Sequence, residues 1–151
     1  MIVETTEKFS PPKGLKIKDK APYVTVVKLD TGPVEKGTEI TVFGQSHGDP
    51  RQTKKQKECA WVTGIYVYDD EGGLVAKPCP LRGRDLLRAK KDVDDRAWPF
   101  TVDRDYANLQ VRYLMRAINK KAGGAFRVSW AKLAVKIGAP DYSAVPVEAA
   151  P

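Results

Sequence analysis

Short stretches of this chain alternate between apolar and polar residues with a period of two, which is the pattern of half-buried β-strands. Residues typical of turns separate these stretches, among them Asp-Asp-Glu-Gly-Gly at 69–73. We expect residues 60–76 to form a hairpin, with Gly72 and Gly73 supplying the positive φ angles of its turn. Residues 44–58 are polar and are expected to be a loop. The strands predicted in this way are 23–29, 38–43, 60–68, 74–76 and 98–102.

The block at residues 103–122 fits two different periods. With a period of 3.6, its apolar residues fall on one face of a helix that Asp103 would cap and the following glycines would end. With a period of two, residues 109–117 alternate as a strand does. Residues 125–137 alternate as well, and their apolar register shifts by one, as a bulge at Ala131–Lys132 would produce. Local signals alone slightly favour the helix.

Proline positions divide the chain. All eleven prolines lie outside residues 101–139, and since proline cannot donate a hydrogen bond to a sheet, they mark turns or edge positions. Residues 1–20 are predicted to be an extended N-terminal arm, and residues 139–151 an extended C-terminal tail. A single domain is expected between them, at 21–138, with one short helix at 84–91.

Three segments resemble the immunoglobulin-like domains of bacteria and phages. Residues 34–44, Val-Glu-Lys-Gly-Thr-Glu-Ile-Thr-Val-Phe-Gly, resemble the turn and second strand of those domains. Trp61, before an alternating strand, is similar to their central-strand tryptophan. Residues 113–117 and 124–130 are similar to their closing strands.

The resemblance implies a mainly β chain folded as an immunoglobulin-like sandwich, with residues 109–137 as a long closing hairpin. The non-carrier Z subunit of the thiosulfate-oxidation carrier complex is one family with that layout. The loop at residues 46–51 resembles the Ser-His-containing loop of that subunit, although the residues after His47 depart from its pattern. The alternative fold is α+β, with a helix at 103–122 packed on an antiparallel sheet.

The composition is that of a soluble globular protein, with 42% apolar and 30% charged residues in a chain of 151. No apolar run approaches the roughly 20 residues of a membrane helix. Residues 1–10 lack the basic and apolar regions of a secretory signal. We therefore expect a cytoplasmic protein, with residence in a virion left open. Cys59 and Cys79 are expected to pack as small apolar side chains, and a bridge between them stays open.

The sequence offers little for catalysis or cofactor binding. It contains neither a Gly-x-x-x-x-Gly-Lys-Ser/Thr phosphate loop nor a Gly-x-Gly-x-x-Gly motif. Two cysteines and the single histidine, His47, are too few for a four-ligand zinc site. The carboxylates at 69–71 and 92–95 lack the spacing of a calcium loop. We predict no enzymatic activity, no cofactor and no metal.

Basic clusters are the strongest functional lead, because a formal net charge of +7 favours polyanionic partners. In a closing hairpin, the Arg and Lys residues of 112–136 would share one outward face. Tyr66, Tyr68 and Tyr113 could stack on bases if they point outward. The candidate residues for binding a polyanion or a protein partner are Arg51, Lys54, Lys55, Lys57, Arg82, Arg84, Arg88, Lys90, Lys91, Arg112, Arg116, Lys120, Lys121 and Arg127.

Together these features predict a non-catalytic structural or protein-interaction module. We expect it to be an accessory subunit of a larger assembly, such as a phage or viral particle. Its partners would be protein subunits of that assembly or further copies of the chain. The alternative is a basic nucleic-acid-binding domain that contacts phosphates through its Lys and Arg patches, with an affinity that falls steeply as salt rises.

Overall fold

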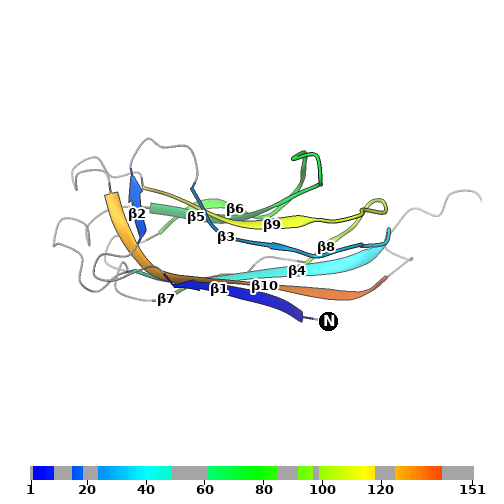
Figure 1. Cartoon of the computed structure of the whole chain (residues 1–151), viewed down its shortest axis with the longest axis horizontal. Helices are drawn as coiled ribbons and strands as arrows, with labels where there is room; N and C mark the ends of the chain where they lie inside the picture. Colours follow the sequence, from blue (N-terminus) through cyan, green and yellow to red (C-terminus); the bar gives the residue numbers. More distant parts are fainter. Residues whose placement is uncertain are drawn as a thin grey trace, which may run out of the picture.

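The computed structural model describes residues 2–8, 15–18, 24–48, 61–84, 92–96, 99–117 and 125–140. All regular structure in this part of the chain is β-strand, arranged as two antiparallel sheets that stack as two layers (Figure 1). The mainly β sandwich predicted from the sequence is therefore confirmed. Within the same ranges, no helix has the length and apolar character needed to span a membrane.

The two layers differ in size among the described residues. Sheet A has six strands and sheet B has four. Sheet A has the order β1 (Ile2–Lys8), β10 (Ala125–Pro140), β4 (Thr38–Gly48) and β7 (Asp92–Arg96), while β2 (Leu15–Lys18) pairs with β10 and β8 (Phe100–Thr101) pairs with β4. Sheet B has the order β3 (Val24–Asp30), β9 (Gln110–Ala117), β5 (Trp61–Tyr68) and β6 (Leu74–Arg84).

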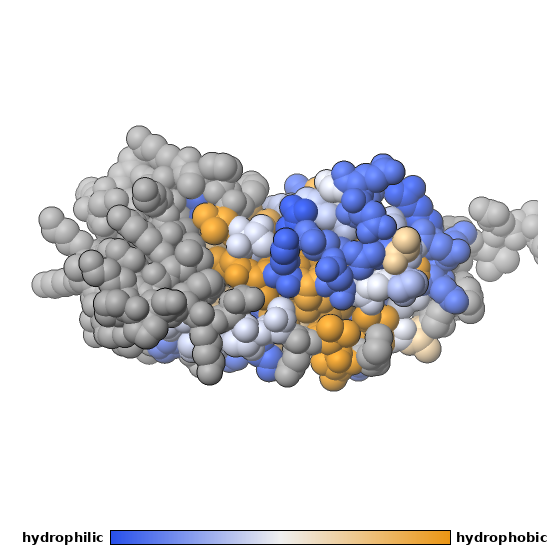
Figure 2. Space-filling view, viewed as in Figure 1, coloured by the Kyte–Doolittle hydropathy of each residue, from blue (hydrophilic) through white to orange (hydrophobic). Residues whose placement is uncertain are grey.

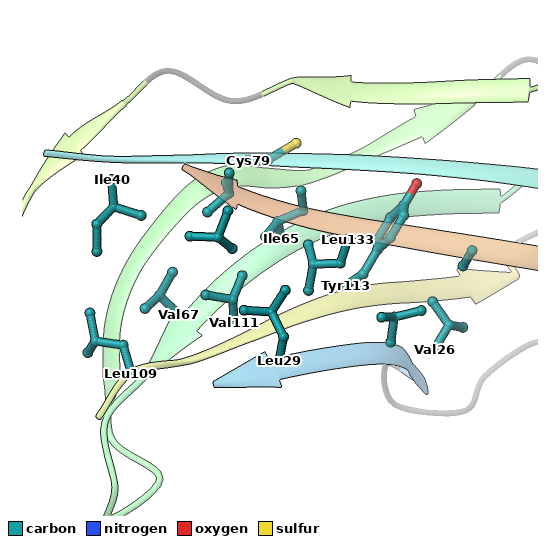
Figure 3. Close-up of a cluster of buried hydrophobic side chains, with 14 of the residues drawn as sticks. Val26, Leu29, Ile40, Ile65, Val67, Cys79, Leu109, Val111, Tyr113 and Leu133 are labelled. Carbon is teal, nitrogen blue, oxygen red and sulfur yellow. The ribbon is translucent and has the colours of Figure 1, made fainter. Parts of the chain in front are cut away.

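The core lies between the layers and is built from the inward members of the alternation in both sheets (Figure 3). Val111, Tyr113 and Met115 of β9 are fully buried there, and Leu133 and Val135 of β10 meet them from the other layer. Each fully buried side chain of this kind contributes about 1.5–3 kcal/mol to folding. On the side where β1 and β3 lie, Figure 2 shows apolar residues at the surface among hydrophilic ones, whereas no residue of the core cluster is more than 8% exposed.

Strands β9 and β10 do not form the closing hairpin that the sequence predicted. β9 pairs with β3 and β5 in sheet B, whereas β10 pairs with β1, β2 and β4 in sheet A. Both strands turn their apolar residues toward the same core, so a period of two cannot distinguish hairpin partners from strands that face each other across a sandwich. The helix alternative for 103–122 is wrong over β9, because burial between two neighbouring strands outweighs the local helix signals.

Strands β4 and β6 extend furthest beyond their predicted ends. β4 continues through the predicted loop as far as Gly48, because Ser46 points inward and is fully buried. β6 continues past residue 76 through Pro78 and Pro80 to Arg84. It is one of the two edge strands of sheet B as described, and a proline is tolerated where its missing N–H would face away from the sheet.

The hairpin of β5 and β6 is confirmed, but its two glycines play different roles. Gly72 has a φ of 79°, as predicted, whereas Gly73 is not among the glycines with positive φ. A Cβ atom at Gly73 would lie 2.8 Å from Asp69 Oδ2. The Asp69 carboxylate accepts hydrogen bonds from the backbone N–H groups of Glu71 and Gly73, so this close approach is what requires glycine at position 73.

The bulge of β10 lies earlier than predicted. The pairing with β4 shifts between Val128 and Trp130, rather than at Ala131–Lys132. Ala131 is fully buried, whereas Trp130 is half-buried and stacks against the ring of His47, with ring centroids 5.9 Å apart. The bulge therefore returns Ala131 to the core and leaves Trp130 beside His47.

The remaining predictions on organisation fall partly outside the described residues. The helix expected at 84–91 begins at Arg84, which ends β6, and its other residues are outside the described ranges. β1 and β2 both lie within the predicted N-terminal arm and pair with β10. The domain boundaries at residues 20 and 139 stay predictions, and so does the state of Cys59; Cys79 is a buried free thiol.

Candidate binding face on sheet B

The outer face of sheet B collects side chains that alternate with the core residues. On β9 these are Gln110, Arg112, the buried Leu114 and Arg116, and on β5 they include Tyr66 and Tyr68. The pairing of β9 with β5 sets Arg112 beside Tyr66 and Gln110 beside Tyr68. Directly opposite residues of neighbouring strands project to the same side, so these side chains form one continuous surface.

Two cations on this face lie over tyrosine rings. The guanidinium carbon of Arg112 is 4.1 Å from the ring centroid of Tyr68, and Arg112 Nε donates a 2.7 Å hydrogen bond to Gln110 Oε1. Lys77 Nζ of β6 lies 5.4 Å from the ring centroid of Tyr66. Such contacts contribute about 0.5–1 kcal/mol at exposed sites and restrict where the charge can lie. The positive charges are therefore held against the sheet.

A third cation, Lys28 of β3, lies directly opposite Arg112. Like charges in opposite positions of neighbouring strands destabilise a sheet. Within the described part of the chain, no ion pair is formed by Lys28, Arg112 or Lys77. We call these three residues the cationic row; Lys28 and Lys77 are exposed and Arg112 is half-buried. The row places three positive charges on one face, and among the described residues no carboxylate neutralises them.

The turn between β5 and β6 carries the opposite charge. Asp70 and Glu71 are exposed and form what we call the acidic tip. In Figure 1 this connection rises on the side of sheet B that faces away from sheet A, which is the side of the cationic row. Leu74, which pairs with Tyr68 just below the tip, is 50% exposed. Acidic, apolar and basic groups thus follow one another on one face.

The neighbouring loop at 103–109 packs against the base of the tip. Arg104 Nη2 lies 3.9 Å from Asp69 Oδ2, and the Arg104 guanidinium carbon is 5.0 Å from the ring centroid of Tyr106. The Tyr106 hydroxyl donates a 2.7 Å hydrogen bond to Asp103. Burial, followed by this hydrogen bond, raises the pKa of Tyr106, and interaction with Tyr106 raises the pKa of Arg104. These contacts tie the tip to the body of the sandwich.

The structure places the predicted binding residues in three groups. Arg112 and Arg116 lie on the outer face of sheet B, whereas Lys132 and Lys136 lie in β10 of sheet A, so the single basic face predicted for residues 112–136 is wrong. Arg82, Arg84 and Arg127 lie in strands, but the positions of their side chains are not described. Those outside the described residues are Arg51, Lys54, Lys55, Lys57, Arg88, Lys90, Lys91, Lys120 and Lys121. The binding role of all of them stays a prediction.

The tyrosines proposed for base stacking are less available than expected. Tyr113 is fully buried in the core, and Tyr66 is only 9% exposed. The ring of Tyr68 is covered by Arg112. Sequence reasoning missed Lys28, Lys77 and Leu74 as parts of this face. The signal for Lys28 was present, because it is a charged residue between the apolar Val27 and Leu29 of a predicted strand and must therefore point outward.

Residues 44–48 read Gly-Gln-Ser-His-Gly, which matches the Gly-x-Ser-x-Gly spacing of a nucleophile elbow. An elbow needs its serine exposed on a sharp turn between a strand and a helix. Here the motif lies inside β4, and Ser46 is fully buried with its hydroxyl 3.1 Å from the Tyr113 hydroxyl. Gly44 is required because a Cβ atom there would lie 2.9 Å from the Tyr113 ring. These residues therefore serve packing.

Metal ligands are sparse as well. Among the described residues, no three His, Cys, Asp or Glu side chains are grouped so that they could hold a metal ion. The absence of a metal and of a cofactor stays a prediction.

Comparisons with known proteins give the fold alone. No family model matches the sequence, and no curated protein matches it. A chain in the structure of the Gx strain of infectious bursal disease virus is similar, with a TM-score of 0.53 and 9% identity over 89% of this chain and 32% of that chain. The VP2 subviral particle of that virus gives a TM-score of 0.47 at 10% identity, covering 96% and 35% of the two chains. A xylan-binding module gives a TM-score of 0.41 at 13% identity, covering 93% of this chain and 98% of that module. The chain spans about a third of the viral chains that it matches.

Proposed function

We propose that this chain is a non-catalytic binding module, an accessory subunit of a larger protein assembly such as a viral or phage particle. The immunoglobulin-like type that the sequence predicted for the sandwich is part of the proposal. The observation that carries it is the outer face of sheet B, where Lys28, Arg112 and Lys77 form no ion pair among the described residues. The viral chain of similar fold is consistent with a sandwich that serves as a building block.

The buried serine supports the non-catalytic part of the proposal. A nucleophile must reach its substrate and be activated by a nearby base. Ser46 is enclosed in the core, and successive residues of a strand point to opposite faces, so the neighbouring His47 side chain cannot activate it.

The geometry gives less support to the nucleic-acid alternative. Binding of single strands combines phosphate contacts with bases stacked on open aromatic rings. On sheet B the cations lie over the rings of Tyr66 and Tyr68, which covers the surfaces that bases would use. The described lysines of the basic face predicted for residues 112–136 are Lys132 and Lys136, and both lie in sheet A, away from Arg112.

The proposal is tested by density-gradient fractionation of the source cells and of any particles they release, followed by immunoblotting for the chain. We expect the chain to migrate with particles far larger than itself. Fluorescence anisotropy of labelled oligonucleotides, from about 50 to about 300 mM salt, tests the alternative. A chain that is absent from every large particle, and that binds oligonucleotides with a steep salt dependence, would overturn the proposal.

A further inference from the structure

We propose that the outer face of sheet B binds a second copy of this chain in a two-fold dimer, with the acidic tip of each copy against the cationic row of the other. This inference rests on the proposed function, because it names the partner and the surface of the binding module. The argument starts from the charges on the face and then asks which group can neutralise them.

The cationic row needs an anionic partner from outside the chain. Lys28 and Arg112 are directly opposite on neighbouring strands, and no carboxylate among the described residues forms an ion pair with either. An approaching pair of carboxylates would remove the repulsion and gain two charge-assisted hydrogen bonds, and Arg112 can bind one of them in bidentate fashion. The hydrogen bond to Gln110 and the contact with the Tyr68 ring already fix the guanidinium group, so little side-chain entropy would be lost on binding.

The acidic tip supplies such carboxylates on the same molecule. Asp70 and Glu71 are adjacent and exposed, whereas Asp69 is used within the turn and by Arg104. The turn that carries the tip rises on the side of sheet B away from sheet A (Figure 1). The row projects to that side as well, because Lys28 and Arg112 alternate with residues buried between the sheets. A two-fold axis through one face brings each patch of one copy against the other patch of its partner, so both contacts form at once and the assembly closes.

Apolar surface lies between the two charged patches. Leu74 is one of two large apolar side chains among the described residues that are strongly exposed, at 50%. It pairs with Tyr68, whose ring carries Arg112 on one side. An apolar centre flanked by charged groups is the usual arrangement of a protein interface. Complementary charges would set the register of the two copies, and burial of Leu74 would add affinity.

Charge reversal with mixing tests the dimer. The full chain is studied by sedimentation velocity over a range of concentrations, as wild type and as the variants D70K/E71K and K28E/K77E. We expect the wild type to dimerise and each variant alone to have a Kd raised about tenfold or more, because like charges then face each other. An equimolar mixture of the two variants should restore a heterodimer with near wild-type affinity, since both contacts regain opposite charges.

The variant K132E/K136E is the matched control, because it changes the net charge by the same amount on sheet A and should dimerise like the wild type. Circular dichroism confirms that each variant is folded. A wild type that stays monomeric at all concentrations would overturn the inference, as would folded variants that fail to associate when mixed. Species that grow without limit would overturn the two-fold geometry, since open chains come from head-to-tail contacts. A monomer that still migrates with large particles would refute this dimer and leave the proposed function standing.

Discussion

Tyr113 carries a hydroxyl group into the middle of an apolar core (Figure 3). The hydroxyl lies 3.1 Å from that of Ser46, which reaches it from β4 in the opposite sheet. A buried polar group is costly unless it is hydrogen-bonded, so this contact links the two layers at one defined position. It also explains why a serine occupies an inward position of β4.

The Ser46–Tyr113 contact can be measured with a double-mutant cycle. Tyr113→Phe should lower the free energy of unfolding by about 1–2 kcal/mol, because the Ser46 hydroxyl loses a partner inside the core. Ser46→Ala and Tyr113→Phe together should cost about 1 kcal/mol less than the sum of the single changes. Urea unfolding of the four proteins measures this. Strictly additive losses would contradict the hydrogen bond.

Tyr106 should make the stability depend on alkaline pH. Its pKa is raised above the ordinary value of 10.0 in the folded chain, first by burial and then by its hydrogen bond to Asp103. The unfolded chain therefore ionises first, and the stabilisation that is present below pH 10.0 is lost as the pH rises through the folded pKa. Urea unfolding of the wild type and of Tyr106→Phe between about pH 8 and 11 should show a difference that shrinks with rising pH. A constant difference would exclude this origin.

Alternation along the chain predicted many of the core residues, although on β5 the residues of both faces are buried from 62 to 67. Ile65, Val111 and Leu133 lie in the core as the period of two requires. It was insufficient to predict which strands pair, because Arg112 and Lys132 alternate in the same way whether β9 and β10 are neighbours or face each other. The cationic row escaped prediction for a related reason: Lys28, Arg112 and Lys77 are far apart in sequence and become neighbours only through strand order.

At the level of the strands, the pairing of β5 with β6 depends on a close approach of their backbones at Gly64. A Cβ atom at Gly64 would lie 2.9 Å from the carbonyl oxygen of Cys79 and 2.9 Å from the backbone nitrogen of Leu81. Backbone atoms cannot move aside as a flexible side chain can. The register of the pair shifts on both sides of Ile65, and this crowding accompanies the irregularity.

Gly64→Ala should therefore force β6 away from β5 and lower the free energy of unfolding by about 1–3 kcal/mol. Gly72→Ala is the comparison, because a Cβ atom there meets open space and only the φ of 79° opposes it, which costs about 1 kcal/mol. Thermal or urea unfolding of both variants gives the two losses. A smaller loss for Gly64→Ala than for Gly72→Ala would refute the close approach as its cause.

Within sheet B, the opposition of Lys28 and Arg112 should cost stability. Lys28→Gln should raise the free energy of unfolding of the monomer by about 0.2–0.5 kcal/mol, because it removes a like-charge pair. Lys136→Gln is the charge-matched control, since Lys136 is exposed and pairs with Ile2 and Thr41. Thermal unfolding at low protein concentration measures both. No gain for Lys28→Gln over Lys136→Gln would show that the sheet tolerates the pair without cost.

Across the whole molecule, the net charge is positive, but one exposed turn is acidic. The chain carries a formal net charge of +7, so two copies repel each other at long range. The exposed Asp70 and Glu71 carry negative charge on a turn that rises from sheet B. Since the Debye length is about 8 Å at physiological salt, the long-range repulsion is screened while contacts across an interface persist. The dimer that we propose would therefore depend on local complementarity rather than on net charge.

The central place of β10 in sheet A also bears on how the chain folds as it is made. Ile2 pairs with Lys136, so the first described strand finds its partner only after all the residues between β1 and β10 have been synthesised. At about 5–20 residues per second, that delay is on the order of ten seconds. During this time β1 and β4 expose the edges that β10 will later occupy, and such edges invite pairing with other nascent chains. Production of this protein should therefore depend on a low concentration of nascent chains or on chaperones that shield these strands until β10 emerges.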